Sequence, residues 1–182
     1  MGKLILVTGG VRSGKSQYVI EQAAKTGKPV LFVATAEAGD GEMKARIEEH
    51  KKSRPANWKT VETRNNLGVQ IENNIGDAQN VIIDCITLLT NNIFMDHIAA
   101  GDKFTEGKVE GSLNTEIESI LGCIRRSKAK FYLVTNEVGL GIVPEHPMSR
   151  LYRDLLGKVN QKLAKAADEV YLFVAGIPVK IK

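Results

Sequence analysis

A glycine-rich segment near the N-terminus contains residue types that bind phosphate. Its eight residues are Gly9, Gly10, Val11, Arg12, Ser13, Gly14, Lys15 and Ser16. They fit the pattern G-x-x-x-x-G-K-[ST] and lie between an expected strand and an expected helix, which is the context that the pattern requires. In such a loop, backbone N–H groups surround phosphate oxygens at a helix N-terminus, where the helix dipole favours anions. Lys15 would neutralise β- and γ-phosphate oxygens, and Ser16 would ligate Mg²⁺.

A carboxylate that supports Mg²⁺ is normally found at the end of a buried apolar strand in phosphoryl-transfer enzymes. The run Val81-Ile82-Ile83-Asp84 ends in such a residue. An Asp in this position is also a common helix N-cap, and residues Ile86–Ile98 are expected to be helical. We therefore predict that Asp84 is a metal ligand and keep the helix cap as the alternative.

His50 offers a second kind of chemistry because three cations follow it in the sequence. Lys51, Lys52 and Arg54 make its surroundings favourable for anions. An imidazole nitrogen can attack phosphorus and form a phosphoramidate, which divides one transfer into two steps. Nearby cations would stabilise the negative charge that develops. His50 is thus a candidate nucleophile.

The alternative for His50 is structural. Met43, Ile47 and His50 are spaced i, i+4 and i+7, so they share one face of an expected helix, and the histidine could simply close that helix. Spacing alone does not choose between the two roles. The other two histidines, His97 and His146, are expected to face solvent.

Apolar, β-branched runs alternate with segments of helical length along the whole chain. The expected strands are Leu4–Thr8, Val30–Ala34, Val81–Asp84, Phe131–Thr135 and Val170–Val174, followed by a Gly-Ile-Pro turn at 176–178 and a last run at Val179–Ile181. The expected helices are Lys15–Thr26, Gly41–Ser53, Ile86–Ile98, Leu113–Ser127 and Met148–Ala167. The range Ala99–Ser112 contains three glycines and mixed charges and is expected to be a loop.

This alternation predicts the fold class. Continuous apolar strands separated by helices indicate a mostly parallel sheet that is covered on both faces. Because proline in sheets is confined to edges and turns, the last two runs should form an antiparallel hairpin at the C-terminal edge. With the phosphate loop, the expectation is a single α/β domain of the P-loop NTPase (RecA-like) type over residues 1–182.

Composition excludes several classes of protein. The 25 Lys and Arg against 21 Asp and Glu give a net charge of only +4 without long basic runs, so a dedicated nucleic-acid binder is not expected. No stretch is long and apolar enough for a membrane span. Cys85 and Cys123 have neither the spacing of a zinc site nor a CxxC pair, and they are expected to be buried thiols in a reducing compartment. We therefore expect a cytoplasmic protein.

A series of motifs in this order resembles one family, the bifunctional adenosylcobinamide kinase/adenosylcobinamide-phosphate guanylyltransferases of cobalamin (vitamin B12) biosynthesis. The motifs are 6–16, 34–36, 42–43, 46–47, 50–51, 54–58, 60–62, 84–87, 134–145, Arg153, 159–161, 166–170 and 176–180. Only Ala99–Ser112 and the stretch near Asn65–Asn80 lack a clear match. The resemblance therefore covers nearly the whole chain.

The resemblance implies a function and a set of site residues. In the family, ATP or GTP phosphorylates adenosylcobinamide, and GTP then gives GMP to an enzyme histidine, which passes it to the new phosphate to form adenosyl-GDP-cobinamide and pyrophosphate. His50 matches that nucleophile. The positions that match nucleotide contacts are Gly9 to Ser16, Ala34, Thr35, Ala36, Lys51, Lys52, Ser53, Arg54, Glu62 and Asp84. A homotrimer is implied as well.

Two other functions fit the phosphate loop alone. A P-loop small-molecule kinase would lack the transferase step and would not use His50 as a nucleophile. A regulatory GTP-binding switch would need the guanine-reading pattern N-K-x-D, whereas the segment Thr135-Asn136-Glu137-Val138 lacks its lysine and aspartate. Labelling of His50 by GTP would separate both from the transferase.

Overall fold

A computed structural model describes residues 2–37, 41–52, 54–101 and 104–182, and these contain one seven-stranded sheet. The strands are β1 (Lys3–Gly9), β2 (Val30–Ala34), β3 (Lys59–Glu62), β4 (Asn80–Asp84), β5 (Lys130–Val134), β6 (Glu169–Val174) and β7 (Ile177–Lys180). Their order across the sheet is β3-β2-β4-β5-β1-β6-β7. All neighbouring strands run parallel except β6 and β7.

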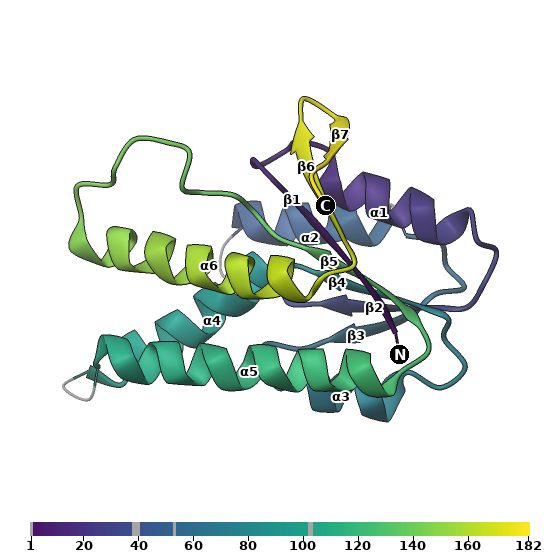
Figure 1. Cartoon of the computed structure of the whole chain (residues 1–182), viewed down its shortest axis with the longest axis horizontal. Coiled ribbons are helices and arrows are strands. Elements are labelled where there is room, and N and C mark those ends of the chain that lie inside the picture. The colour runs from purple at the N-terminus through teal and green to yellow at the C-terminus, as the bar shows by residue number, and fades with distance from the viewer. Residues whose placement is uncertain (1, 38–40, 53, 102–103) are drawn as a thin grey trace.

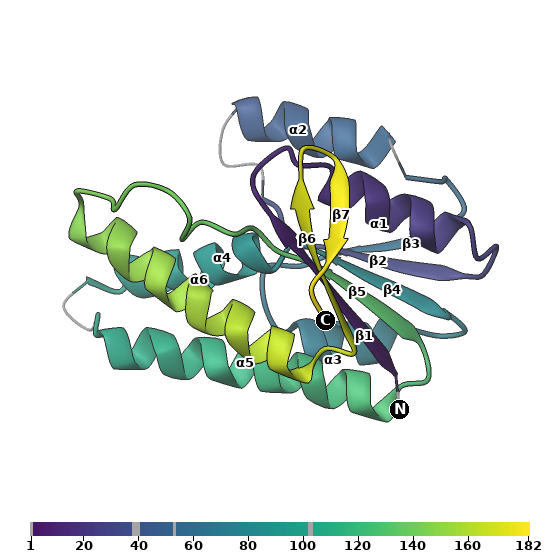
Figure 2. The same ribbon diagram turned by 45° about the horizontal axis from the view of Figure 1, so that its top comes forward.

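Helices cover both faces of this sheet (Figure 1). They are α1 (Lys15–Ala24), α2 (Gly41–Lys52), α3 (Leu67–Asn74), α4 (Ile86–Ala99), α5 (Glu106–Arg126) and α6 (Pro147–Ala166). Helices α1 and α2 lie on one face, and α3 to α6 lie on the other, as the rotated view in Figure 2 also shows. The predicted α/β architecture is confirmed.

Two apolar layers form because each central strand buries both sets of its alternating side chains. In β1, Leu4 and Leu6 join the larger cluster under α3 to α6, whereas Ile5 and Val7 join the smaller cluster under α1. Side chains of a strand alternate between faces, so a strand covered on both sides must be apolar throughout. This explains why the strand runs in the sequence are continuous rather than alternating.

The antiparallel β6–β7 pair forms the C-terminal edge of the sheet, as predicted. Phe173 lies opposite Pro178 in this pair. Proline is tolerated there because β7 is an edge strand, where one side of the backbone has no further strand to pair with. Exposed apolar side chains remain on this hairpin, among them Ile177 and Val179.

The prediction of a loop over Ala99–Ser112 is wrong for its second half, because α5 begins at Glu106. The side chain of Thr105 caps this helix by accepting a hydrogen bond from the Lys108 amide. Val109 and Leu113 are one turn apart and buried in the core. Their packing outweighs the low helix propensity of the two glycines in this part of the helix.

Two short elements, β3 and α3, were not among the expected ones. β3 is a four-residue edge strand with mostly exposed side chains, so its pattern is weak. α3 has eight residues, of which Leu67 and Ile71 are buried. Both elements are stabilised by tertiary contacts, and their sequences carry no strong local signal.

The remaining expectations concern cysteines, histidines and membranes. Both cysteines are free; Cys123 is buried, as expected, and Cys85 is half-buried. His146 is exposed, as expected, but His97 is half-buried with Nε2 2.9 Å from the Ser112 Oγ. In the described ranges, no helix has the length and apolar character that crossing a membrane requires.

Candidate active site

The phosphate loop connects the end of β1 to the start of α1, and two of its glycines are required by geometry. Gly9 has φ +143°, and a Cβ there would lie 2.5 Å from the carbonyl oxygen of Phe173. Gly14 has φ +96° and is the N-cap residue of α1. Only glycine adopts such conformations without steric cost. The loop therefore presents its backbone at the positive end of a helix dipole.

Lys15 is the buried cation of this loop. Its Nζ donates to the carbonyl oxygens of Gly9 (3.0 Å) and Gly10 (2.6 Å), with Ser13 Oγ at 3.4 Å. Burial lowers the pKa of Lys15, and the nearby Asp84 carboxylate acts in the opposite direction. The ammonium group is thus kept inside the loop by neutral oxygen acceptors and one carboxylate charge.

A cavity of about 620 Å³ opens beside the loop at the carboxyl ends of β2, β4 and β5. Most of the predicted site residues line it: Val11, Arg12, Ser13, Gly14, Lys15, Ser16, Ala34, Ala36, Lys51, Arg54, Glu62 and Asp84. Residues from three strands and two helices thus converge on one space, although they are spread from position 11 to position 84. In open α/β sheets, ligands bind in this kind of crevice at the carboxyl ends of the strands.

Some predicted residues do not line this cavity. Gly9 and Gly10 serve instead as acceptors for Lys15, and Lys52 is exposed at the end of α2. Thr35 is buried, and its hydroxyl donates to the Cys85 carbonyl at 2.7 Å and accepts from the Cys85 amide at 2.8 Å. Thr35 therefore holds the end of β2 to the segment after β4, and its contact with nucleotide stays a prediction.

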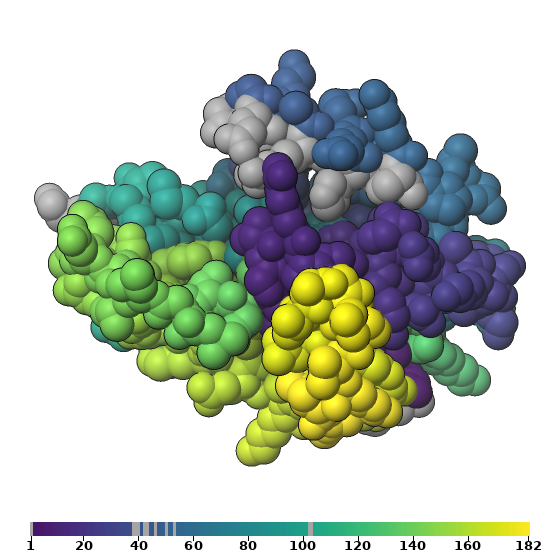
Figure 3. All heavy atoms as spheres, turned by 90° about the horizontal axis from the view of Figure 1, so that it is seen from above, coloured from purple at the N-terminus to yellow at the C-terminus, as the bar shows by residue number. Residues whose placement is uncertain are grey.

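Two predicted residues fall outside what the structure describes. Ser53 lies outside the described residues. His50 belongs to α2, but its side chain is outside the described part. The described residues Ile47 and Glu49 of the same helix line the cavity, so α2 borders it immediately before position 50. Figure 3 shows α2 (blue) and the phosphate-loop region (purple) on one face of the molecule.

Ser16 and Asp84 both line the cavity, one in the first turn of α1 and the other at the end of β4. The N-cap position of α4 is occupied by Cys85, without a side-chain cap bond, so the alternative role of Asp84 as that cap does not hold. Across the described residues, no group of three His, Cys, Asp or Glu is arranged to hold a metal ion. Mg²⁺ bound through one or two protein ligands and substrate phosphates needs no such group.

Arg54 provides a second, half-buried cation in the cavity lining. Its guanidinium carbon lies 3.8 Å above the centre of the Phe32 ring, a cation–π contact. Its buried Nε has no hydrogen-bond partner among the described residues. Burial lowers the pKa of Arg54, and the charges of Asp84 and Glu62 oppose this. A guanidinium group stays charged in proteins, so the cavity contains a fixed positive charge suited to phosphate.

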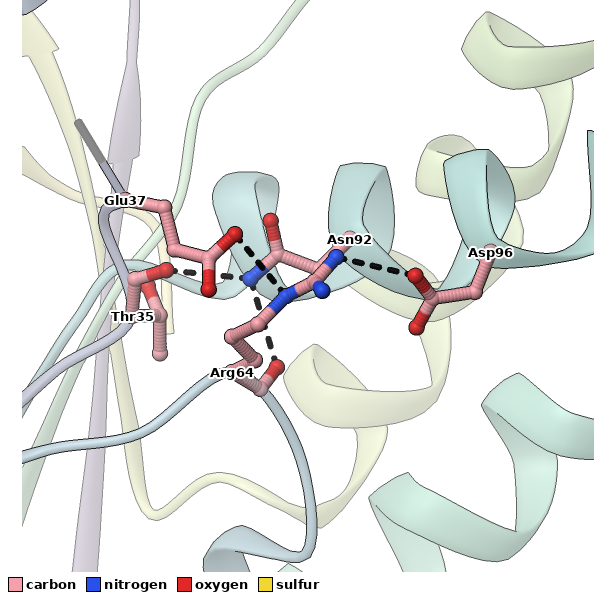
Figure 4. Close-up of polar contacts among 5 residues, drawn as sticks. All are labelled: Thr35, Glu37, Arg64, Asn92 and Asp96. Carbon is pink, nitrogen blue, oxygen red and sulfur yellow. Dashed lines mark hydrogen bonds and ion pairs between the residues drawn. The ribbon is translucent and has the colours of Figure 1, made fainter. Parts of the chain in front are cut away.

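A polar network behind the cavity holds the segment that follows β2 (Figure 4). The side-chain amide of buried Asn92 donates to the carbonyl oxygens of Thr35 (3.0 Å) and Arg64 (3.3 Å). Arg64 in turn pairs with Glu37 and Asp96, both at 2.9 Å. The network links α4 to the backbone on either side of Ala36, a cavity residue, and so fixes this part of the wall.

Eight lining residues were missed by the sequence analysis: Gln17, Ile20, Ile47, Glu49, Cys85, Leu88, Val134 and Asn136. Three of them could have been found from the sequence. Ile20 follows Ser16 by one helical turn, Cys85 follows Asp84, and Asn136 comes directly after the expected strand Phe131–Thr135. The rest depend on how the helices pack, which no short pattern shows.

Comparison with known proteins identifies the family of this chain. The family model described as cobinamide kinase/cobinamide phosphate guanyltransferase matches residues 5–181. The chain belongs to this family. Among curated proteins, it is 45% identical to the bifunctional adenosylcobalamin biosynthesis protein CobU of Escherichia coli strain K12, over 98% of this chain and 99% of the relative.

Further members of the cobinamide kinase/guanyltransferase family are similar over their full length. The chain is 42% identical to CobU of Salmonella typhimurium strain LT2, over 98% of this chain and 99% of the relative. It is 38% identical to the bifunctional protein CobP of Pseudomonas aeruginosa PAO1, over 97% and 96% respectively. All three relatives are named as bifunctional proteins of adenosylcobalamin biosynthesis.

Solved structures of more distant proteins share the fold alone. The RadB recombinase aligns with a TM-score of 0.54 at 14% identity, over 94% of this chain and 74% of that one. The flagellar accessory protein FlaH of Methanocaldococcus jannaschii aligns with a TM-score of 0.56 at 13% identity, over 100% and 78%. The expected RecA-like P-loop fold is thereby confirmed.

Proposed function

We propose that both reactions of the family occur at the cavity beside the phosphate loop. The observation that supports this most strongly is the convergence of Lys15, Arg54, Ser16 and Asp84 on one space of about 620 Å³. The buried Lys15 and the half-buried Arg54 can neutralise a triphosphate, and the hydroxyl and carboxylate can share a metal ion. The substrates are ATP or GTP together with adenosylcobinamide and then its phosphate.

In the first reaction, a nucleoside triphosphate transfers its γ-phosphoryl group to the hydroxyl of adenosylcobinamide. The loop amides and Lys15 hold the β- and γ-phosphates, and Arg54 adds positive charge from another part of the cavity lining. Phosphoryl transfer depends mainly on positioning and charge stabilisation, which these groups supply. Ser16 and Asp84 would hold Mg²⁺, which neutralises charge on the phosphates when it is bound.

In the second reaction, a nitrogen of His50 attacks the α-phosphorus of GTP. The N–P bond forms as the bond to the bridging oxygen breaks, and pyrophosphate leaves with that electron pair. An oxygen of adenosylcobinamide phosphate then attacks the same phosphorus and releases the histidine. The attacking nitrogen must be unprotonated, because only a free lone pair can form the bond to phosphorus.

The assembly and location of the enzyme are part of this proposal. We expect a single-domain chain over residues 1–182 that works in the cytoplasm as a homotrimer. Exposed apolar side chains support an interface between subunits: Leu140, Ile142 and Val143 are 84, 98 and 61% exposed. Apolar patches of this kind mark contact surfaces. Sedimentation equilibrium should give three times the chain mass of 19.9 kDa, and a monomer mass at micromolar concentration would contradict it.

A single-turnover experiment with two labels tests the function. With γ-labelled nucleotide, adenosylcobinamide should become labelled; with α-labelled GTP, the protein itself should gain a label that is acid-labile and alkali-stable. Transfer of the γ label without labelling of the protein would support a kinase that lacks the transferase step. Hydrolysis without either transfer would support a GTP-binding switch.

A further inference from the structure

Asn136 occupies a position that neither the phosphate-loop pattern nor the metal-ligand pattern includes. Strand β5 lies between β1 and β4, and Val134 pairs with both Val7 and Asp84 in the sheet. Asn136 follows two residues later, so it emerges between the strand that leads into the phosphate loop and the strand that ends in Asp84. It lines the same cavity as Lys15.

The backbone of Asn136 is held firmly from two helices. Its amide donates to the hydroxyl of Thr87 in α4 at 2.6 Å, and its carbonyl oxygen accepts from the side-chain amide of Asn160 in α6 at 3.0 Å. Asn160 is itself fixed by the Thr135 hydroxyl at 2.8 Å. The next residue, Glu137, donates its amide to the Gly9 carbonyl at 3.0 Å, which ties this segment to the phosphate loop.

These bonds use only the backbone of Asn136. Within the described residues, its own side-chain amide has no hydrogen-bond partner. A half-buried amide whose backbone is fixed by α4, by α6 and, through Glu137, by the phosphate loop, and whose donors have no described partner, is preorganised to contact a ligand in the cavity.

We propose that Asn136 is a further catalytic residue of the phosphoryl-transfer step, in which its Nδ2 donates a hydrogen bond to the phosphoryl group in transit. This rests on the proposed function, which places the triphosphate on the phosphate loop. The acceptor hydroxyl oxygen bonds to the γ-phosphorus while the bond to the β-bridging oxygen breaks, the electron pair leaves on the nucleoside diphosphate, and the hydroxyl proton passes to water. Charge on the γ-oxygens would then be met by Lys15 and by the neutral Asn136 donor.

The proposal predicts a difference between the two reactions. Guanylylation of His50 breaks the α–β bond, so the γ-phosphate stays within the leaving pyrophosphate, and a donor at the γ-position matters less. Removal of one preorganised donor from a developing charge costs about 100-fold in rate or more. We expect Asn136→Ala to lower kcat of the kinase step by about 100-fold and the rate of protein guanylylation by less than about 5-fold.

The test compares Asn136→Ala and the near-isosteric Asn136→Asp with Asn73→Ala, which changes an exposed residue of α3. GTP affinity should stay within about 3-fold of the parent in Asn136→Ala, and Asn136→Asp should lose at least as much kinase activity, because its carboxylate repels phosphate. A kinase kcat near the parent value in either variant would overturn the proposal. Equal losses in both reactions with weakened GTP binding would also overturn it and indicate a structural role.

A Lys15→Ala variant shows whether a negative result concerns Asn136 alone or the proposed nucleotide site as a whole. If Lys15→Ala abolishes the kinase step while Asn136→Ala leaves it intact, the nucleotide site stands and only the role of Asn136 is wrong. If Lys15→Ala keeps full activity, the triphosphate is not on the phosphate loop and the proposed function fails first.

Discussion

Helices α1 and α2 lie on the same face of the sheet and border the same cavity, but they are attached to the protein in different ways. α1 follows the phosphate loop directly and buries Lys15, Val19, Ile20 and Ala23. Of the α2 side chains that the structure describes, Ile47 is half-buried and the others are exposed. The phosphate loop and α1 therefore rest on the core, whereas none of the described α2 side chains is fully buried.

This difference in burial suggests that α1 and α2 have different tasks in the site. Elements with few buried apolar contacts open at low free-energy cost, whereas elements built into the core do not. A phosphate loop must present its donors in a fixed geometry, which suits α1. A nucleophile that accepts GMP at one phosphorus and later presents it to a large second substrate can sit on a more weakly packed helix such as α2.

The largest effect, on the kinase rate, is expected at Lys15 at the start of α1. Lys15→Ala removes the buried ammonium group that faces the triphosphate, so the kinase rate should fall by about 100-fold or more. Lys25→Ala, at the exposed end of α1, is the matched control and should leave the rate within about 2-fold, since loss of an exposed charge is worth little. Steady-state phosphorylation of adenosylcobinamide is the measurement. Similar kinase rates for Lys15→Ala and Lys25→Ala would contradict a catalytic role of Lys15.

A smaller effect, on GTP affinity, is expected at Arg54. Arg54→Ala removes hydrogen bonds to charged phosphate worth about 1.5–3 kcal/mol, so GTP should bind about 10- to 100-fold more weakly. Arg54→Lys should recover only part of this, because an ammonium group cannot form the same paired contacts. Lys44→Ala changes an exposed lysine of α2 that lies outside both the cavity lining and the predicted nucleotide contacts, and it is the control. Calorimetric titration with GTP gives the result, and equal affinities for Arg54→Ala and Lys44→Ala would contradict it.

The smallest effect concerns stability and compares two isoleucines directly. Ile20 of α1 is 5% exposed, so Ile20→Ala should lower the free energy of unfolding by about 2–5 kcal/mol. Ile47 of α2 is only half-buried, and Ile47→Ala should cost less than about 1 kcal/mol. Urea denaturation of both variants, monitored by circular dichroism, measures the difference. Equal losses would show that α2 is attached as firmly as α1.

The same contrast explains what the sequence could and could not predict. The phosphate loop was predictable because the special conformations of Gly9 and Gly14 leave a fixed pattern of residue types. Asp84 was predictable because a single acid ends a fully apolar run. Strand β3 and helix α3 were not, because both are short and depend on partners far away in the chain.

Side-chain direction was the least predictable part of the site. Thr35 belongs to a segment that resembles a nucleotide-binding motif, yet its hydroxyl bonds to the Cys85 backbone. Asn136 belongs to a family-like motif to which the sequence analysis assigned no site role, yet it follows the strand between β1 and β4 and lines the cavity. Both outcomes depend on strand order in the sheet, which local spacing does not contain.

We propose that the two reactions use separable groups, Lys15 and the phosphate loop for the kinase step and His50 for guanylylation. The most direct test is to incubate His50→Ala with α-labelled GTP and, separately, to measure its phosphorylation of adenosylcobinamide. We expect no label on the protein and a kinase rate within about 3-fold of the parent, because Lys15 and the phosphate loop are unchanged. A His50→Ala protein that still gains the acid-labile label, or that loses both activities together while remaining folded, would contradict it.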